Sequence, residues 1–257
     1  MLSFIVPAYN EELELPSTIN AIHNAVKDRS ADGRIRDGEQ YEIIVVDDAS
    51  TDTTVQVAQD SGAKVVSINR RQIAAARNAG ARASNGEIMF FVDADTRINH
   101  KHVSGAIAAF EEGCSGGGAR IVVGGTIPVW ARVLLKAFCA LYFGFNFGAG
   151  AFLFTTRKNF DAVGGFDERL FIAEEIYFSI ALRRLVRFRI LPEPVVTSGR
   201  KLRMYFAREI LGNSLNVILR GPRAARSRAG LHIWYDGKRE TRSAFADVRR
   251  DESTSTP

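Results

Sequence analysis

The sequence has little cysteine and little histidine, which excludes several classes of small cross-linked or metal-stabilised protein. Its 257 residues include two cysteines, Cys114 and Cys139, and four histidines. Two cysteines cannot form a disulfide framework, and neither residue type recurs at the spacing of a zinc site. We therefore expect a chain that folds around a hydrophobic core and suits a reducing compartment.

The amino terminus lacks the pattern of a secretion signal. Residues 1–3 lead directly into an apolar, strand-like run, with no basic region and no cleavage pattern. We therefore expect a cytoplasmic protein, which could also lie peripherally on the inner face of the cell membrane.

The chain also lacks an unbroken apolar stretch of membrane-spanning quality. Residues 137–154 carry no charge and approach the length of a span, but glycines and an asparagine interrupt them. The preceding stretch, Trp130 to Phe147, is aromatic, and its charges are Arg132 and Lys136. This composition predicts either an ordinary core helix or a helix that lies in the headgroup region of an anionic membrane, and both are favoured over a true membrane span.

Positive charge is concentrated in one part of the sequence. The net charge is +5, yet residues 181–230 hold twelve Arg and Lys against two Glu. This segment should meet phosphates or an anionic membrane surface. We expect no nucleic-acid partner.

The first 98 residues show apolar strands alternating with amphipathic helices. The expected strands are Leu2–Val6, Tyr41–Val46, Lys64–Ile68 and Ile88–Val92, and the expected helices lie near residues 15–26, 51–62 and 74–84. This alternation predicts an α/β fold with a doubly wound, mostly parallel central sheet flanked by helices.

Three of these strands end in polar residues. Tyr9 and Asn10 follow the first strand, Asp47 and Asp48 close the second, and Asp93-Ala94-Asp95 follows the fourth. Ligands bind at the carboxyl ends of strands in such sheets, so we expect one shared site. In an extended chain Asp93 and Asp95 would point the same way, and two hard oxygen ligands suit Mg²⁺ or Mn²⁺.

The pattern is less regular after residue 98. We expect a helix near 101–112, a turn at Gly116–Gly118, a strand over 120–129 and another over 148–155. A helix should begin near Glu174 and end near Arg184, followed by two short strands at 187–191 and 195–196. We expect one catalytic domain over 1–220, with halves 1–98 and 99–220, then a basic extension over 221–257 whose last dozen residues are disordered.

Several motifs now occur in order along the chain. They are Val6-Pro7-Ala8-Tyr9-Asn10-Glu11, Val45-Val46-Asp47-Asp48-Ala49-Ser50-Thr51-Asp52, Ala76-Arg77-Asn78-Ala79-Gly80, Asp93-Ala94-Asp95, Gly148-Ala149-Gly150-Ala151, Gly164-Gly165-Phe166-Asp167-Glu168 and Glu174-Glu175. Together they resemble an inverting family 2 glycosyltransferase of the GT-A fold, the nucleotide-diphospho-sugar transferase fold. The resemblance covers about residues 2–205.

The resemblance implies a nucleotide-diphosphate sugar as donor. It implies that Tyr9 and Asp48 hold the nucleoside, that Arg77 and Asn78 lie near the nucleotide or sugar, and that Asp95 binds the metal. The donor site would comprise Pro7, Tyr9, Glu11, Asp48, Arg77, Asn78, Asp93, Ala94, Arg200, Lys201 and Arg203. Asp93 would lie near the ribose or the metal, and Arg200, Lys201 and Arg203 could clamp the diphosphate.

The resemblance also implies a general base at the start of a late helix. Related proteins usually show Glu-Asp there, with Asp as the base, and this chain has Glu174-Glu175. Glu175 matches the base by position, and Glu174 is the alternative. Taken alone, two acids at a helix start would equally be explained by the helix dipole.

The sequence thus predicts a metal-dependent enzyme that moves one sugar from a nucleotide-diphosphate sugar to an acceptor hydroxyl. The favoured acceptor is a lipid or lipid-linked molecule at the cytoplasmic membrane face. The alternatives are a soluble transferase that acts on a small molecule or a protein, and a nucleotide-sugar-binding module that has lost catalysis.

Overall fold

A computed structural model of the protein describes residues 1–31, 40–124, 147–200, 204, 225–228 and 231. The residues that carry the membrane-helix prediction, 130–146, lie outside this described part, as do Lys201 and Arg203. No helix in the described ranges is both long enough and apolar enough to span a membrane.

Eight strands form a single sheet, whose order is β3-β2-β1-β4-β7-β6-β8-β5. The strands are β1 (Leu2–Ala8), β2 (Tyr41–Asp48), β3 (Lys64–Ile68), β4 (Ile88–Val92), β5 (Thr96–Arg97), β6 (Gly116–Gly124), β7 (Phe152–Thr156) and β8 (Phe188–Ser198). β1 to β4 are mutually parallel, and β7 is antiparallel to both of its neighbours. The predicted α/β fold with a mostly parallel sheet is confirmed.

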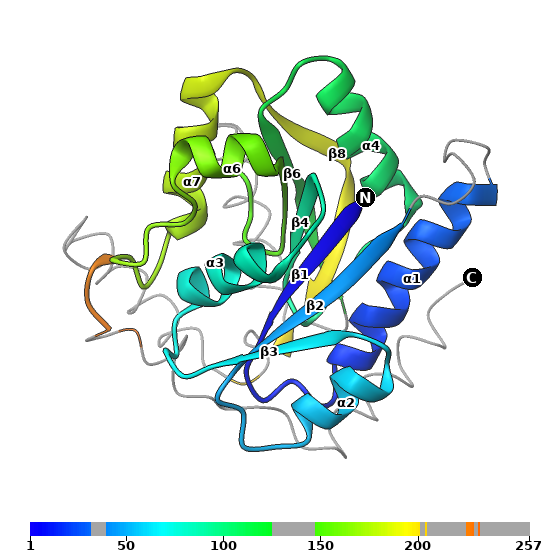
Figure 1. Ribbon diagram of the computed structural model, residues 1–257, viewed down its shortest axis with the longest axis vertical. Helices are drawn as coiled ribbons and strands as arrows, with labels where there is room; N and C mark the ends of the chain where they lie inside the picture. Colours follow the sequence, from blue (N-terminus) through cyan, green and yellow to red (C-terminus); the bar gives the residue numbers. More distant parts are fainter. Residues whose placement is uncertain (32–39, 125–146, 201–203, 205–224, 229–230, 232–257) are drawn as a thin grey trace.

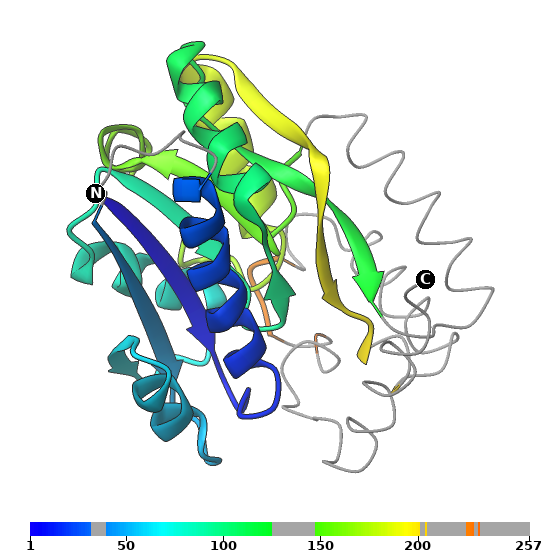
Figure 2. The same cartoon turned by 90° about the vertical axis from the view of Figure 1, so that its right-hand side faces the viewer.

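Helices cover both faces of this sheet, as Figures 1 and 2 show. The helices are α1 (Leu15–Ala31), α2 (Thr54–Asp60), α3 (Ile73–Ala83), α4 (His100–Glu111), α6 (Arg157–Val163) and α7 (Glu174–Leu185). α1 and α4 lie on one face and pack together, while α3, α6 and α7 lie on the other. The prediction of a helix from Glu174 to about Arg184 is confirmed by α7.

Alternating strand residues supply the two hydrophobic layers. Phe4 and Phe90 point to the α1 side, where their rings stack 4.8 Å apart. Ile5 and Phe91, one residue along each strand, belong to the other layer, beneath α3 and α7. This period of two is what a strand buried on both faces requires.

The glycine run at 116–118 corrects one sequence expectation. These residues do not form a turn but open β6, between β7 and β8. A Cβ at Gly117 would lie 2.2 Å from the carbonyl oxygen of Arg189 and 2.3 Å from Cζ of Phe154. Glycine therefore serves close packing here, because the large Phe154 ring occupies the space of a side chain.

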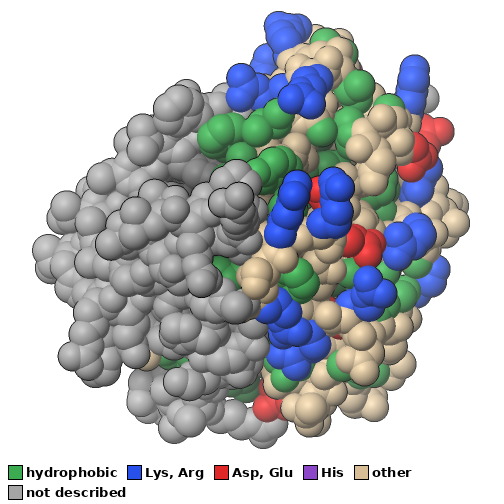
Figure 3. Space-filling view, turned by 90° about the vertical axis from the view of Figure 1, so that its left-hand side faces the viewer, with side chains coloured by type: hydrophobic (Ala, Val, Ile, Leu, Met, Phe, Trp, Pro, Cys, Tyr) green, Lys and Arg blue, Asp and Glu red, His purple; other side chains and the backbone are tan. Residues whose placement is uncertain are grey.

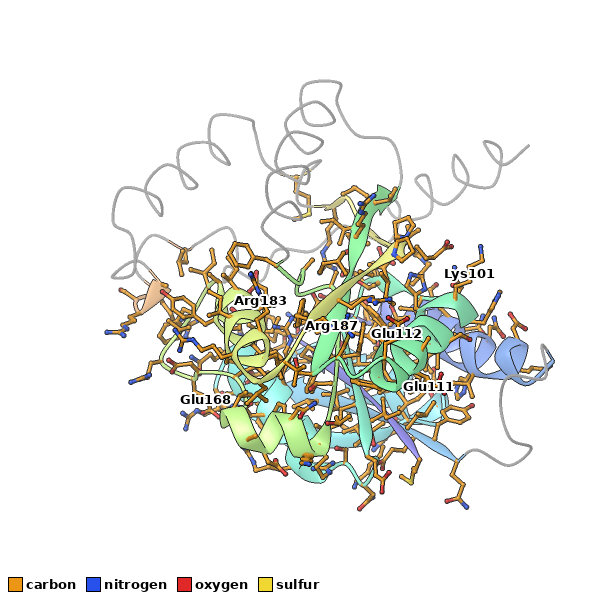
Figure 4. The ribbon with its side chains drawn as sticks, turned by 90° about the horizontal axis from the view of Figure 1, so that it is seen from above. Lys101, Glu111, Glu112, Glu168, Arg183 and Arg187 are labelled. Atoms are coloured by element: carbon orange, nitrogen blue, oxygen red, sulfur yellow. The ribbon has the colours of Figure 1, made fainter. Side chains whose placement is uncertain are left out.

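The end of the sheet near α4 differs from prediction in a second way. Instead of two short strands, β8 runs unbroken from Phe188 to Ser198 through Pro192 and Pro194. Arg187, just before it, donates a 2.6 Å hydrogen bond to the carbonyl oxygen of Glu112, and both residues are labelled in Figure 4. β8 therefore begins beside the end of α4 and runs to the carboxyl ends of the central strands.

We expect Gly117→Ala to lower the free energy of unfolding by about 3 kcal/mol, the upper end of the usual cost of overpacking, because backbone as well as side chain must move. Urea denaturation followed by circular dichroism measures this change. Gly105→Ala, in the interior of α4, is the matched control: its Cβ would meet only the flexible Leu191 side chain, at 3.1 Å. An unchanged unfolding midpoint for Gly117→Ala would contradict this view of β6.

Candidate active site

The carboxyl ends of β1, β2 and β4 lie together at one edge of the sheet (Figure 1). The loops after β1 and β2 are joined by hydrogen bonds. The backbone N–H of Asn10 donates to Ser50 Oγ at 2.9 Å, and the side-chain oxygen of Asn10 accepts from the N–H of Thr51 at 2.8 Å. The polar residues that end these strands therefore build a shared, ordered rim, as the strand pattern predicts.

Arg77 of α3 is the most buried charge of this rim, with a side chain only 1% exposed. Its guanidinium donates to Glu174 Oε1 at 2.7 Å, to Asp93 Oδ1 at 3.0 Å and to the carbonyl oxygen of Gly150 at 2.9 Å. A Cβ at Gly150 would lie 2.9 Å from Arg77 Nη2, so glycine is needed there for the guanidinium to approach. Arg77 thus joins the turn after β4 to the start of α7.

Arg200, at the end of β8, makes a second arrangement of the same kind. Its guanidinium forms two 2.5 Å hydrogen bonds with the buried Glu11 carboxylate and lies 3.5 Å from Asp95 Oδ2. Burial disfavours the charged guanidinium, but Glu11 and Asp95 more than offset this, so the pKa of Arg200 is raised. Two Glu–Arg–Asp chains, Glu174–Arg77–Asp93 and Glu11–Arg200–Asp95, therefore flank the Asp93–Asp95 turn.

The Asp93-Ala94-Asp95 segment is a turn rather than the extended chain assumed from the sequence. The N–H of Thr96 donates to the carbonyl oxygen of Asp93 at 3.0 Å, and Thr18 donates to the carbonyl oxygen of Ala94 at 2.8 Å. The side chains of Asp93 and Asp95 are 29% and 18% exposed, so both carboxylates reach the surface of the rim. Asp95 Oδ1 also accepts from Thr197 at 3.3 Å, a contact that the sequence did not predict.

The carboxylates of Asp93 and Asp95 could supply some of the ligands of a divalent cation. Within the described ranges, Asp93 Oδ2 has no hydrogen-bond partner, and no group of three or more Asp, Glu, His or Cys side chains is arranged to enclose a metal. Burial, together with repulsion from Asp95, raises the pKa of Asp93 to about 6 despite the neighbouring Arg77. Such a pair suits Mg²⁺ or Mn²⁺ that completes its coordination with substrate phosphates and water.

Glu174 and Glu175 differ sharply at the start of α7. Glu174 is buried, only 4% exposed, and is held by Arg77. Glu175 is partly buried, and burial together with the charge of Glu174 raises its pKa to about 8. Of the two candidates for a general base, Glu175 is the one whose carboxylate is not fixed by Arg77.

The other predicted donor residues lie on the same rim, and some already have structural contacts. Both oxygens of Asp48 accept backbone N–H groups of residues 70–72. Asn78 exchanges hydrogen bonds with the backbone of Phe166 and donates to Glu168. Pro7 and Tyr9 are partly buried at the end of β1, and Arg71 lies over the Tyr9 ring at 3.2 Å, a contact with no signal in the sequence.

Lys and Arg side chains are prominent on the face that Figure 3 shows, which lies on the α3, α6 and α7 side. Three exposed arginines lie at or just after the end of α7, one of the helices on this side: Arg183, Arg184 and Arg187. These belong to the basic segment noted in the sequence, most of whose other residues lie outside the described part.

We expect Glu11→Ala to destabilise the fold by about 3–5 kcal/mol, because it leaves the buried Arg200 without its bidentate partner. Chemical denaturation at pH 7 measures the effect. Glu112→Ala is the matched control. Both side chains of the Glu112–Arg189 ion pair are exposed, so loss of this pair should lower the free energy of unfolding by less than about 1 kcal/mol. Equal costs for the two variants would show that the Glu11–Arg200 pair is not the buried tie described here.

Comparison with known proteins gives a family, relatives and a fold. A model of the family described as Glycosyl transferase family 2 matches residues 3–175. A dolichol-phosphate mannosyltransferase of Pyrococcus furiosus is 31% identical over 135 residues, a match that covers 50% of this chain and 36% of that protein. The matched stretch is thus about a third of the relative's length.

Two solved structures share the fold at low sequence identity. TarS of Staphylococcus aureus in complex with UDP-GlcNAc superposes with a TM-score of 0.58 at 19% identity, covering 92% of this chain and 71% of that one. The mannosyltransferase PcManGT of Pyrobaculum calidifontis, in complex with GDP-Man and Mn²⁺, gives 0.57 at 17%, covering 100% and 76%. These likenesses confirm the predicted GT-A fold.

Proposed function

The chain belongs to glycosyltransferase family 2, and we propose that it transfers one sugar from a nucleotide-diphosphate sugar to an acceptor hydroxyl, with inversion at the anomeric carbon. The observation that carries this proposal is the position of Glu175. Glu175 directly follows Glu174, and Arg77 bonds to both Glu174 and Asp93. The titratable Glu175 carboxylate therefore lies near the Asp93–Asp95 turn, at the carboxyl edge of the sheet. Such an edge is where ligands bind in open α/β sheets.

The donor half of the proposal rests on the rim of β1, β2 and β4. Tyr9 offers an aromatic face to a nucleobase, and Asp95 with Asp93 would hold Mg²⁺ or Mn²⁺. A divalent cation bound there would neutralise the negative charge that develops on the departing diphosphate. The UDP-GlcNAc and GDP-Man complexes of the two structural neighbours support a nucleotide-sugar donor.

The acceptor half rests on Glu175. We assign it the proton of the acceptor hydroxyl, which it takes as that oxygen attacks the anomeric carbon and the bond to the diphosphate breaks. A carboxylate whose pKa is about 8 is a stronger base than an ordinary glutamate, because burial disfavours its charge. Glu174 then serves as the partner that fixes Arg77 rather than as the base.

For the acceptor itself we propose a lipid or lipid-linked molecule at the cytoplasmic membrane face. The name of the Pyrococcus relative, a dolichol-phosphate mannosyltransferase, supports this class. The exposed arginines at the end of α7 fit an anionic surface as well.

We expect Glu175→Gln to lower the rate of transfer by about 10²–10⁴-fold while donor affinity is unchanged, since the substitution removes a proton acceptor and preserves size. Rate should be measured as nucleoside diphosphate released with a panel of UDP- and GDP-sugars and lipid acceptors, and affinity by calorimetry. In the unsubstituted protein kcat/KM should rise with pH, reach half its maximum near the Glu175 pKa of about 8 and level off above it, because Glu175 must lose its proton to act. Glu111→Gln, on α4, is the control.

Two outcomes would revise this assignment. A fully active Glu175→Gln beside an inactive Glu174→Gln would move the base one residue back. Donor binding without turnover, over the whole panel and at every pH, would favour a nucleotide-sugar-binding module.

We expect Asp95→Asn to abolish the part of donor binding that depends on Mn²⁺. The amide keeps the size of the side chain but removes the charge that a divalent cation needs. Calorimetric titration of UDP and GDP with and without Mn²⁺ measures this, with circular dichroism to verify the fold. Asp60→Asn, on the exposed surface of α2, should keep the full effect of Mn²⁺. Retained Mn²⁺ dependence in Asp95→Asn would place the metal elsewhere.

A further inference from the structure

The loop that joins α6 to α7, residues 164–173, ends directly before Glu174. Its last residue, Ala173, has a φ of +65°, in the left-handed region that residues with a side chain seldom adopt. The carbonyl oxygen of Ala173 accepts the N–H of Ile176 at 3.0 Å, which closes the first turn of α7. The position of the 164–173 loop therefore determines where α7 begins, and with it where Glu175 lies.

Gln72, the residue before α3, holds the middle of the 164–173 loop. Gln72 is buried, and its side-chain nitrogen donates to the carbonyl oxygens of Glu168 and Leu170, the latter at 3.0 Å. Glu168 is labelled in Figure 4. A side-chain amide nitrogen carries two N–H donors, so one glutamine can serve both carbonyl groups. Gln72 therefore fixes the loop at two points shortly before Ala173.

The backbone of Gln72 is fixed in turn by the end of β2. Its N–H donates to Asp48 Oδ2 at 2.7 Å. Further along α3, Arg77 donates to Glu174 at 2.7 Å. α3 thus holds the start of α7 in two ways, directly through Arg77 and by way of the loop through Gln72. A left-handed residue such as Ala173 persists only where its surroundings enforce the conformation, and the bonds from Gln72 are part of those surroundings.

We propose that Gln72 is a positioning residue for the transfer reaction: through the 164–173 loop it holds the start of α7 where Glu175 can take the proton of the acceptor hydroxyl. The inference deepens the proposed function and rests on it. A general base must lie within hydrogen-bond reach of the proton that it accepts, and a displacement of about 1 Å can lower the rate about 100-fold. A hydrocarbon side chain at position 72 would leave both loop carbonyls without their donor.

The test is Gln72→Met, which keeps the length of the side chain and removes both donors. Its kcat should fall about 10- to 100-fold with the UDP- or GDP-sugar and lipid acceptor that the unsubstituted protein turns over fastest in the panel above. The dissociation constant of UDP or GDP with Mn²⁺, measured by calorimetry, should not change, because Asp48 still holds the backbone of residue 72. Amide hydrogen exchange of the 164–173 loop should become at least about tenfold faster.

Ser115→Ala is the matched control, because it also removes a buried donor from two carbonyl oxygens, but at the other end of α7. The Ser115 hydroxyl lies 2.8 Å from the carbonyl oxygen of Leu182 and 3.2 Å from that of Arg187. This variant should lose stability in chemical denaturation, as Gln72→Met does, yet keep both kcat and the slow exchange of the 164–173 loop.

A second variant, Gln72→Asn, keeps the amide but is too short to reach both carbonyls. It should show the same loss of kcat, and it replaces Gln72→Met if that variant does not fold. An unchanged kcat or unchanged loop exchange in a folded Gln72 variant, or an equal loss of kcat in Ser115→Ala, would overturn the inference and leave the proposed function standing. If the unsubstituted protein turned over no member of the panel, both would be overturned.

Discussion

The site depends on the two buried arginines that flank the Asp93–Asp95 turn. Arg77 and Arg200 come from α3 and from the end of β8, and each binds one buried glutamate and one of the two aspartates. A buried charge is tolerated only when it is paired and hydrogen-bonded. Each arginine therefore requires the elements around it to stay in register, which fixes the ends of β1 and β4 against the start of α7.

Negative charge remains in excess despite these arginines. Arg77 faces Glu174 and Asp93, with Glu175 close enough for their charges to interact, so one cation balances several carboxylates. The consequence is visible in the raised pKa of Asp93, about 6, and of Glu175, about 8. Strongly shifted carboxyl groups at a strand-end rim are typical of functional sites, because burial and mutual repulsion prepare them to gain a cation or a proton.

The sequence predicted the parts of this arrangement that local patterns determine. Strand and helix periodicity gave the central sheet, and the parallel order placed Tyr9, Asp48 and Asp95 at one edge. It did not give the partners of Arg200, because Glu11 is 189 positions away and only the folded chain brings the two together. The glycines at 116–118 were mistaken for a turn, since a glycine needed for close packing looks the same in sequence as one needed for a bend.

Polar residues at the strand ends are of two kinds: some have side chains hydrogen-bonded to neighbouring loops, and others have side chains with atoms that make no hydrogen bond within the described part of the chain. Asp48 and Asn78 match motif positions, yet the structure engages their side chains with backbone groups of the neighbouring loops. The Arg71 side chain and the outer oxygen of Asp93 show the opposite: they reach the same rim, and within the described ranges neither makes a hydrogen bond, although Arg71 stacks on the Tyr9 ring. A polar group must bond to protein, water or ligand. The unbonded atoms of Arg71 and Asp93 are therefore available to water or to a ligand, whereas the bonded side chains of Asp48 and Asn78 hold the surrounding loops in position.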